Sequence, residues 1–282
     1  MNLTQKLNFT INCKGTLIDL STPKIMGIIN LTPDSFYDGG KHEEIANILT
    51  HVEKMLQHGA TFIDVGGYSS RPGAVDITLE EELIRVLPII ETLVDKFPEI
   101  LISIDTFRSK VAKSAVDAGV AIVNDISAGI LDKTMIPTVG ELKVPYIMMH
   151  MKGTPRTMTS LTNYDDLITE MKSYFSYQIA EARKHQINDI VIDPGFGFAK
   201  NSSQNFEILQ QLNLFQSFNL PILAGLSRKS MIYKTLGKLP KDALNGTTCL
   251  NTIALLQGAS ILRVHDVAEA AECVTLLNAL KN

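Results

Sequence analysis

Polar side chains stand at or just after the ends of eight short apolar runs in this sequence. Asp105 directly follows "ISI", Asn124 follows "AIV", and Asp193 follows "IVI". Two carboxylates and an amide offer the acceptors and donors that a flat, polar heterocycle needs, provided that the fold brings the ends of the runs together. The complete set of these polar residues is Asn30, Ser69, Ser70, Arg71, Asp105, Asn124, Asp125, His150, Asp193, Ser227, Arg228, Lys229, Ser230, Arg263 and His265.

Each of these residues also has a purely structural interpretation. Asp105 precedes "TFRSK", where a carboxylate could serve as the N-cap of a helix. Asp193 precedes "PGFGFAK", whose glycines and aromatic residues indicate a loop, so contact with a ligand is the favoured interpretation there. A single polar residue after a strand is ordinarily a cap or a turn, whereas a polar residue after every run is typical of a binding site.

Four basic residues near the ends of the runs indicate an anionic ligand. Arg71, Lys229, Arg263 and His265 bring positive charge to a chain whose formal net charge is -4, and together they predict a phosphorylated ligand. Taken singly, Arg228 or Lys229 could be a solvated surface charge and His265 a satisfied polar contact. The sequence has no Walker A, GxGxxG, HExxH or GxSxG motif and no cysteine–histidine nucleophile pair, so the corresponding enzyme classes are not favoured.

The composition is that of a globular protein without a broad nucleic-acid surface. Hydrophobic residues make up 45% of the 282 residues, and a pI near 5.9 argues against the basic face that a phosphate backbone requires. No apolar run approaches the ~20 residues of a membrane span, and the first residues lack the features of a signal peptide, so we expect a cytoplasmic protein. Cys13, Cys249 and Cys273 have neither disulfide nor metal-ligand spacing and are expected to be buried small residues.

The apolar runs predict an α/β fold, specifically a (β/α)8 TIM barrel. They do not alternate with polar residues, which is typical of parallel strands buried on both faces. An open, doubly wound sheet is the structural alternative. Residues 7–20 predict an added N-terminal β-hairpin that turns at Lys14–Gly15 and closes one end of the barrel. The expected strands are 25–29, 62–65, 101–104, 120–123, 145–149, 190–192, 221–224 and 261–264.

The connections between the runs are of two kinds. The segments "HGATFIDV", "AGVAIVND" and "QGASILRV" each predict a helix end, a glycine with positive φ and the start of a strand. Amphipathic helices are expected near 79–97 and 167–182. The second kind of connection is a long segment between a strand and the next helix. Long segments with little regular pattern are usually functional, and in one barrel domain over 1–282 they would share the rim at the carboxyl ends of the strands. The long connections are 31–44, 66–78, 151–163 and 225–243.

Eight motifs, in their order along the chain, resemble the dihydropteroate synthase family of folate biosynthesis. They are "GIINLTPDSFYDGG", "DVGGYSSRPGA", "SIDTF", "VNDI", "MMHMKGTP", "DPGFGFAK", "GLSRKS" and "RVHDV". The resemblance implies a (β/α)8 barrel, usually a homodimer, that joins 6-hydroxymethyl-7,8-dihydropterin diphosphate to 4-aminobenzoate with the help of Mg²⁺. It also implies a transferase that sulfonamides target. Two positions depart from the family pattern "GGESTRPG", because Tyr68 replaces Glu and Ser70 replaces Thr.

The resemblance also implies roles for individual residues. The implied metal ligand is Asn30, and the implied catalytic residues are Asp105, Asp193, Lys229, Arg263 and His265. The implied diphosphate contacts are Asn30, Ser70, Arg71, Arg263 and His265. The implied pterin contacts are Asp105, Asn124, Met148, Asp193 and Lys229. The implied 4-aminobenzoate contacts are Phe36, Pro72, Phe198, Lys229 and Ser230.

Three other functions compete with the synthase. A pterin-binding methyltransferase barrel would need no diphosphate site, so Arg71 and the motifs "SRKS" and "RVHD" argue against it. A non-catalytic pterin-binding paralogue would not need Asn30 or His265, and an isomerase or aldolase barrel would bind a sugar phosphate instead of a pterin. For a homodimer, the segments near 245–257 and 267–280 are the expected contact faces, because both are apolar on much of their surface.

Overall fold

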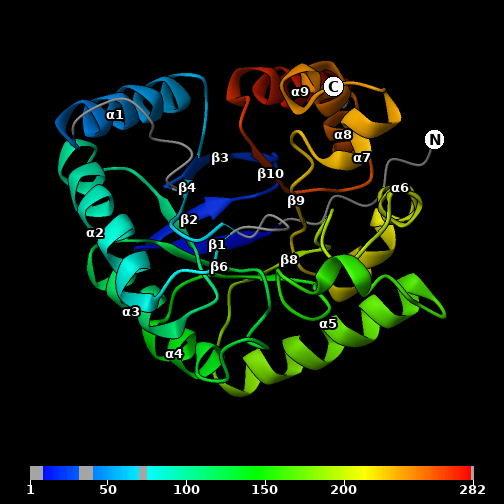
Figure 1. Cartoon of the computed structure of the whole chain (residues 1–282), viewed down its shortest axis with the longest axis horizontal. Coiled ribbons are helices and arrows are strands. Elements are labelled where there is room, and N and C mark those ends of the chain that lie inside the picture. Colours follow the sequence, from blue (N-terminus) through cyan, green and yellow to red (C-terminus); the bar gives the residue numbers. More distant parts are fainter. Residues whose placement is uncertain (1–8, 32–40, 70–74, 281–282) are drawn as a thin grey trace.

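Strands and helices alternate along most of the chain (Figure 1). The structure is a computed structural model that describes residues 9–31, 41–69 and 75–280. The strands are β1 (Thr10–Cys13), β2 (Thr16–Asp19), β3 (Lys24–Asn30), β4 (Phe62–Gly66), β5 (Ile102–Asp105), β6 (Ile122–Asp125), β7 (Tyr146–Met149), β8 (Ile190–Asp193), β9 (Leu223–Ala224) and β10 (Ile261–Val264). The helices are α1 (Lys41–Gln57), α2 (Leu79–Lys96), α3 (Ser109–Asp117), α4 (Met135–Leu142), α5 (Leu167–Lys184), α6 (Ser202–Gln210), α7 (Ser230–Thr235), α8 (Leu244–Leu256) and α9 (Val267–Ala279).

The parallel strands form a nearly closed barrel. Within the described residues, the order of hydrogen-bonded strands is β8-β7-β6-β5-β4-β3-β10-β9, and neighbouring strands are parallel. A parallel bridge between Ile192 in β8 and Ile222 just before β9 joins the two ends of this order. Figure 1 shows the helices around the strands in chain order. The predicted (β/α)8 barrel is confirmed, and the open sheet is excluded.

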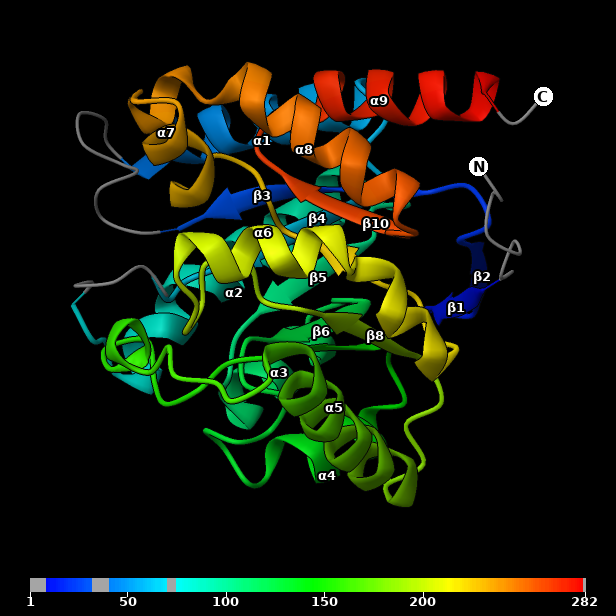
Figure 2. The ribbon, with the colours of Figure 1, turned by 90° about the vertical axis from the view of Figure 1, so that its right-hand side faces the viewer.

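The N-terminal hairpin closes one end of the barrel. β1 and β2 pair antiparallel, and Lys14 and Gly15 between them have φ of 53° and 84°, as a two-residue hairpin turn requires. Ile11, Cys13 and Leu20 pack against apolar strand residues in a buried cluster of their own. Figure 2 shows the hairpin at the end opposite the arrowhead of β3. The predicted hairpin is confirmed within the described residues.

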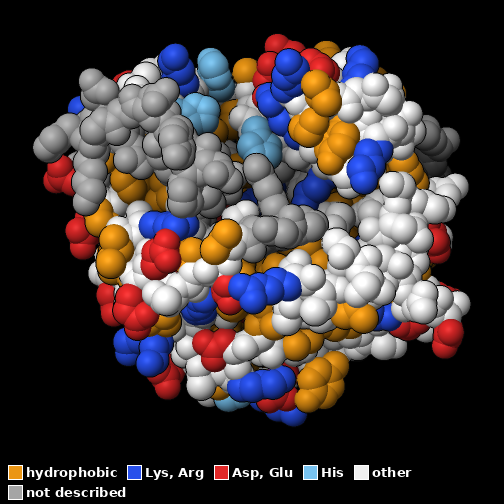
Figure 3. Space-filling model, viewed as in Figure 1, with side chains coloured by type: hydrophobic (Ala, Val, Ile, Leu, Met, Phe, Trp, Pro, Cys, Tyr) orange, Lys and Arg blue, Asp and Glu red, His pale blue; other side chains and the backbone are white. Residues whose placement is uncertain are grey.

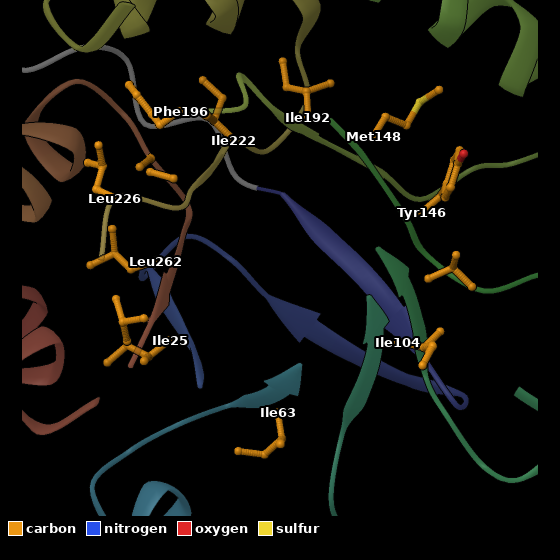
Figure 4. Packing of buried hydrophobic residues seen from close by; sticks show 14 of the residues in the cluster. Ile25, Ile63, Ile104, Tyr146, Met148, Ile192, Phe196, Ile222, Leu226 and Leu262 are labelled. Carbon is orange, nitrogen blue, oxygen red and sulfur yellow. The ribbon is translucent and has the colours of Figure 1, made fainter. Parts of the chain in front are cut away.

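The two sides of each strand contribute to different cores. In β4, Phe62 packs with the hairpin cluster inside the barrel, whereas Ile63 and Val65 belong to a larger core between the strands and the helices. Figure 4 shows part of this larger core, to which many strands contribute. Because both sides of each strand are apolar over most of its length, apolar and polar residues do not alternate in these segments of the sequence. The two-residue period of a strand places Asp64 on the same interior side as Phe62, one step closer to the carboxyl end.

The helix-to-strand joints have the predicted glycines. Gly59, Gly119 and Gly258 have φ of 97°, 107° and 98°, a region that residues with a Cβ avoid. These joints reverse the chain in a few residues at the end of the barrel near the hairpin. The helices expected near 79–97 and 167–182 are α2 and α5, and both are confirmed.

Most predicted strand boundaries differ from the structure by one or two residues, and β9 is only two residues long (Leu223–Ala224) where 221–224 was expected. The strand expected at 120–123 spans Ile122–Asp125, because the backbone N–H of Val120 still bonds to Ala115 in α3. The loop expected at 225–243 contains α7 and a 3₁₀ turn, which its mixed polar and glycine-rich sequence did not indicate.

The cysteines are placed as expected in only two of three cases. Cys13 and Cys273 are buried, but Cys249 is exposed because it lies on the outer side of α8. Within the described ranges, none of the helices is both long and apolar enough to cross a membrane.

Candidate active site

The polar residues predicted at the strand ends meet at one end of the barrel. Asp105 pairs in register with Gly66 on one side and with Asn124 on the other, and Asp193 pairs with Met149. Because the strands are parallel, their carboxyl ends share one rim, which lies toward the arrowhead of β3 in Figure 2. Figure 3 looks onto this rim, where basic and histidine side chains show near the centre.

Arg263 lies between two carboxylates inside this rim. Its Nε donates to Asp64 Oδ2 at 2.6 Å, and its Nη2 donates to Asp105 Oδ2 at 2.7 Å. Asn124 donates from Nδ2 to the same oxygen of Asp64 at 3.1 Å. Asp64 is fully buried, and the side chain of Arg263 is only 19% exposed. We call these four side chains, from β10, β4, β5 and β6, the Arg263 network.

The charges in the Arg263 network do not balance, because two carboxylates face one guanidinium. Burial raises the pKa of Asp105 to about 7. The positive charge of Arg263 opposes this rise, and the carboxylates of Asp64, Glu82 and Asp125 add to it. Burial opposes the charge on Arg263, but Asp64 and Asp105 outweigh burial and raise its pKa. A ligand that donates hydrogen bonds to Asp105 would therefore stabilise its ionised form.

A second group of residues surrounds Asp193. Its Oδ1 accepts a hydrogen bond from the N–H of Gly195 at 2.7 Å. Burial raises the pKa of Asp193, and the bond from Gly195 and the charges of Lys229 and Arg263 oppose this rise. The Nζ of Lys229 lies 4.5 Å from the centroid of the Phe198 ring, within the range of a cation–π contact. An acceptor, a cation and an aromatic face are thus held close together.

The loop after β9 is fastened to the loop after β10. Ser227 Oγ and His265 Nδ1 are 3.0 Å apart, and the N–H of His265 donates to Ser227 Oγ at 3.2 Å. Arg228 forms a two-point ion pair with Asp266, at 3.0 and 2.6 Å. These contacts place Lys229 at the N-cap position of α7. Arg228 is therefore committed to this ion pair, while its neighbour Lys229 approaches Phe198.

The structure describes some of the remaining predicted site residues and leaves others outside the described ranges. Asn30 ends β3 beside Gly66, and so reaches the rim. Asp105 is not a helix cap, because the N-cap residue of α3 is Arg108 and Asp105 binds Arg263 instead. Ser230, the first residue of α7, follows Lys229. The predicted contacts that lie outside the described residues are Phe36, Ser70, Arg71 and Pro72.

Met148 is not brought to this rim. It is fully buried in the larger core between the strands and the helices (Figure 4). Its neighbour Met149 pairs in register with Asp193 and belongs to a small cluster against which Phe198 packs. Since successive residues of a strand face opposite sides, Met149 is the methionine on the side of Asp193.

Two further strand-end residues are engaged in buried contacts. Asp125 accepts hydrogen bonds from the backbone N–H of Ser127 at 2.8 Å and from the hydroxyl of Tyr146 at 2.7 Å. His150 Nδ1 lies 3.0 Å from the Nζ of Lys200. Both Asp125 and His150 are buried.

Sequence reasoning missed Asp64 and Lys200. Asp64 interrupts the apolar run "FIDVG", and a charged residue inside a strand buried on both faces was a signal that it has a buried partner. Lys200 ends the segment "DPGFGFAK" and is only 7% exposed. Nothing in the residues around Lys200 indicates that this lysine is buried.

Known proteins resemble this chain over nearly its whole length. A dihydropteroate synthase from Escherichia coli (strain K12) is 43% identical over 268 residues, which cover 94% of this chain and 94% of that protein. The structure of Yersinia pestis dihydropteroate synthase with a sulfonamide drug complex has a TM-score of 0.90 and 38% identity, and covers 97% of this chain and 99% of that one. The structure of Xanthomonas albilineans dihydropteroate synthase with 4-aminobenzoic acid has a TM-score of 0.89 and 37% identity, and covers 96% and 98%.

A family model described as "Pterin binding enzyme" matches residues 26–265, which span every strand of the barrel from Met26 onward. Together with the barrel and its polar rim, this match defines the chain as a pterin-binding enzyme. The chain belongs to the dihydropteroate synthase family, whose members are transferases of folate biosynthesis.

The buried position of Asp64 yields a prediction about stability. Asp64→Ala removes the acceptor shared by Arg263 and Asn124 and leaves both donors without it, which should lower the free energy of unfolding by about 3 kcal/mol. Urea denaturation measures this change. The matched control is Asp266→Ala, which breaks the more exposed pair with Arg228 and should cost less than about 1 kcal/mol. Equal losses in the two variants would contradict a special role for Asp64.

Proposed function

We propose that this chain condenses 6-hydroxymethyl-7,8-dihydropterin diphosphate with 4-aminobenzoate and releases 7,8-dihydropteroate and diphosphate. The observation that carries the proposal is the Arg263 network, in which Asp64 and Asp105 share one cation beside Asn124. The pyrimidine edge of a pterin presents ring N–H and amino donors, which complement an excess of acceptors. The 4-aminobenzoic acid bound to the Xanthomonas albilineans relative supports the second substrate. Residues 1–282 would form one domain around this site.

The pterin would lie between the two carboxylates at the rim. Asp105 and Asp193 would accept hydrogen bonds from its donors, and Asn124 would complete the edge. Lys229 would contact the pterin from the side of α7. Met149 takes the place of Met148 as the methionine that lines the pterin, since Met149 shares the side of Asp193.

The diphosphate would bind to basic groups at the same rim. No described residue accepts a hydrogen bond from Nη1 of Arg263. The N–H groups of Nη1 could therefore donate to a phosphate oxygen. His265 is held beside Ser227 on the neighbouring loop and would provide a second contact. Ser70 and Arg71, which lie outside the described residues, complete the proposed set.

Asn30 would hold Mg²⁺ through its side-chain oxygen. In the described part of the chain, no group of three or more His, Cys, Asp or Glu side chains could bind a metal ion. Mg²⁺ keeps several waters and takes few protein ligands when it binds together with substrate phosphates, so the single amide oxygen at the end of β3 fits this ion. When bound, Mg²⁺ supplies neutralisation of charge on the leaving diphosphate.

The 4-aminobenzoate would bind above the pterin. The ring of Phe198 offers an aromatic face, and Lys229 beside it offers a cation for the carboxylate. Ser230 follows Lys229 at the start of α7 and offers a hydroxyl group. Phe36 and Pro72, outside the described residues, would complete this pocket.

The residues of this site act by orientation and electrostatics. The bond between the pterin methylene carbon and the diphosphate oxygen breaks with its electron pair on the diphosphate, where Arg263 and His265 hold the negative charge. The amine nitrogen of 4-aminobenzoate forms the new carbon–nitrogen bond and then loses a proton to solvent water. Asp105 and Asp193 offset the positive charge that develops on the pterin, so no covalent enzyme intermediate is needed.

The experiment that tests this proposal follows diphosphate release by the purified protein with the pterin diphosphate and Mg²⁺. We expect release that depends on 4-aminobenzoate and matches the dihydropteroate formed. Pterin binding without any release would support a non-catalytic or methyl-carrier function instead. Failure to bind a pterin would contradict the proposal and favour a sugar-phosphate barrel.

Two substitutions test the assigned roles. Asp193→Asn and Arg263→Ala should each lower turnover about a hundredfold or more, because the removed charge acts mainly in the transition state. Circular dichroism and thermal melting would establish that the variants are folded. A near-normal turnover in either folded variant would refute the role assigned to that residue.

The raised pKa of Asp105 predicts pH-dependent pterin binding. Above its pKa of about 7 the carboxylate is ionised and accepts hydrogen bonds, and below it the proton removes an acceptor. The affinity for 6-hydroxymethylpterin, which lacks phosphate, should therefore fall as the pH is lowered from about 8 to about 6. Titration calorimetry measures this, and Asp105→Asn should bind weakly with little pH dependence. A pH-independent affinity in the parent protein would argue against this assignment.

The chain would act as a homodimer through α8 and α9. Leu256 on α8 and Leu276 on α9 are exposed apolar residues, and Leu280 at the end of α9 is exposed as well. Exposed leucines on adjacent helices are typical of a contact surface between subunits. Sedimentation should give a dimer, whereas a strict monomer at micromolar concentration would contradict this interface.

A further inference from the structure

A buried lysine lies beneath the loop that carries Phe198. Lys200 is only 7% exposed, and its Nζ lies 3.0 Å from His150 Nδ1 and 3.3 Å from the carbonyl oxygen of His150. The same Nζ donates to the carbonyl oxygens of Gly195 at 3.0 Å and Phe198 at 2.9 Å. One side chain therefore connects the exit of β7 with two points of the loop between β8 and α6.

The chemistry around this nitrogen suits an ammonium group. Burial lowers the pKa of Lys200 to about 7, and the charge of Asp193 opposes this shift. All four neighbouring atoms can accept hydrogen bonds, and an ammonium group has three protons to donate. Burial also lowers the pKa of His150 well below its usual value, so the imidazole is neutral and its Nδ1 can accept from Lys200.

The loop needs such support because one of its residues, Ala199, has an unfavourable backbone conformation. Gly195, Gly197 and Ala199 have φ of 71°, 82° and 50°, and the last is a residue with a Cβ in the left-handed region. A Cβ at Gly195 would lie 2.2 Å from the carbonyl oxygen of His150, so the loop and the end of β7 are in close contact. Conformations of this kind persist where the surroundings hold them in place.

The loop presents two aromatic rings in different directions. Phe196 is 1% exposed and lies in the larger core (Figure 4). Phe198 is half-buried, packs against the small cluster that includes Met149 and Met151, and meets Lys229 at 4.5 Å. One carbonyl oxygen that Lys200 binds belongs to Phe198 itself, so Lys200 fixes the backbone from which this ring extends.

We infer that Lys200 is a positioning residue that acts through Phe198 to set the affinity for the second, aromatic substrate. The inference rests on the proposed function, because that proposal assigns Phe198 to the 4-aminobenzoate pocket. Lys200 itself lies below the loop and would touch neither substrate. Its removal should free the ring of Phe198 while the Arg263 network remains in place.

A fluorescence measurement tests the structural part without relying on activity. The sequence contains no tryptophan, so Phe198→Trp introduces a single indole into the loop. Adding Lys200→Met should increase acrylamide quenching of this indole about threefold and lower its anisotropy, because the loop opens locally. The matched control is Lys152→Met, since Lys152 is bound to Glu170 and the ring of Tyr164 and has no bond to the loop carbonyls among the described residues. Equal quenching in the two double variants would overturn the inference.

Steady-state kinetics test the functional part. Lys200→Met should raise the KM for 4-aminobenzoate about tenfold and raise the Kd for 6-hydroxymethylpterin much less, because Lys200 acts on the pterin site only through its charge interaction with Asp193. In a Phe198→Ala background the same substitution should add little, because the two residues act as one unit. If the effects of Lys200→Met and Phe198→Ala on this KM were fully additive, or if Lys200→Met weakened the binding of both substrates equally, Lys200 would have a general structural role and the inference would be overturned.

The two measurements separate failure of the inference from failure of the proposed function. If the parent protein makes no dihydropteroate, the proposed function fails, and the fluorescence comparison still decides whether Lys200 positions Phe198. If the indole is released but the KM for 4-aminobenzoate stays constant, the link between Phe198 and this substrate is refuted. If Lys200→Met does not fold, Lys200→Gln replaces it. Its shorter amide side chain can keep only part of the bonds to the carbonyl oxygens of Gly195 and Phe198, so quenching should rise by a smaller factor, and no rise at all would overturn the inference.

Discussion

The ion pairs of Arg263 with Asp64 and Asp105 are the interaction on which the rim depends. The guanidinium reaches from β10 past β3 to two carboxylates on β4 and β5, and so connects strands that are not neighbours. A buried and a partly buried carboxylate for one cation are costly in the free protein, and the pKa of Asp105 reflects this cost. A ligand rich in hydrogen-bond donors removes the imbalance, so an unfavourable feature of the free protein becomes a source of affinity and specificity.

The barrel allows this polar network because its other layers are apolar. The hairpin residues fill the opposite end of the interior, and the outer sides of the strands pack against the helices. Water is thereby kept from the lower side of the network, which strengthens its electrostatic interactions. The short glycine joints at the hairpin end leave the longer connections at the rim, where Lys229 and Phe198 approach the same region from different loops.

The sequence was sufficient to predict the features that depend on local chemistry. The strands, the hairpin turn at Lys14 and Gly15, and the glycine joints follow from residue types over short spans. The side of Met148 could not be predicted, because a strand buried on both sides shows no alternation. The pairing of Asp105 with Arg263 could not be predicted from the sequence either, since 158 residues separate them and the choice of partner depends on the closed barrel. The burial of Lys200 could not be predicted either, because it depends on how the loop folds back on itself and against His150 at the end of β7.

The long sequence separation within the Arg263 network also bears on how the chain folds. Asp64 and Arg263 are 199 residues apart, and Arg263 lies on β10, which follows the other described strands of the barrel along the chain. A nascent chain that has already buried Asp64 and Asp105 would hold two carboxylates without their cation, which disfavours early closure of a partial barrel. Completion of the barrel is therefore coupled to the arrival of β10, and assembly is expected to be slow and cooperative because it depends on contacts distant in sequence.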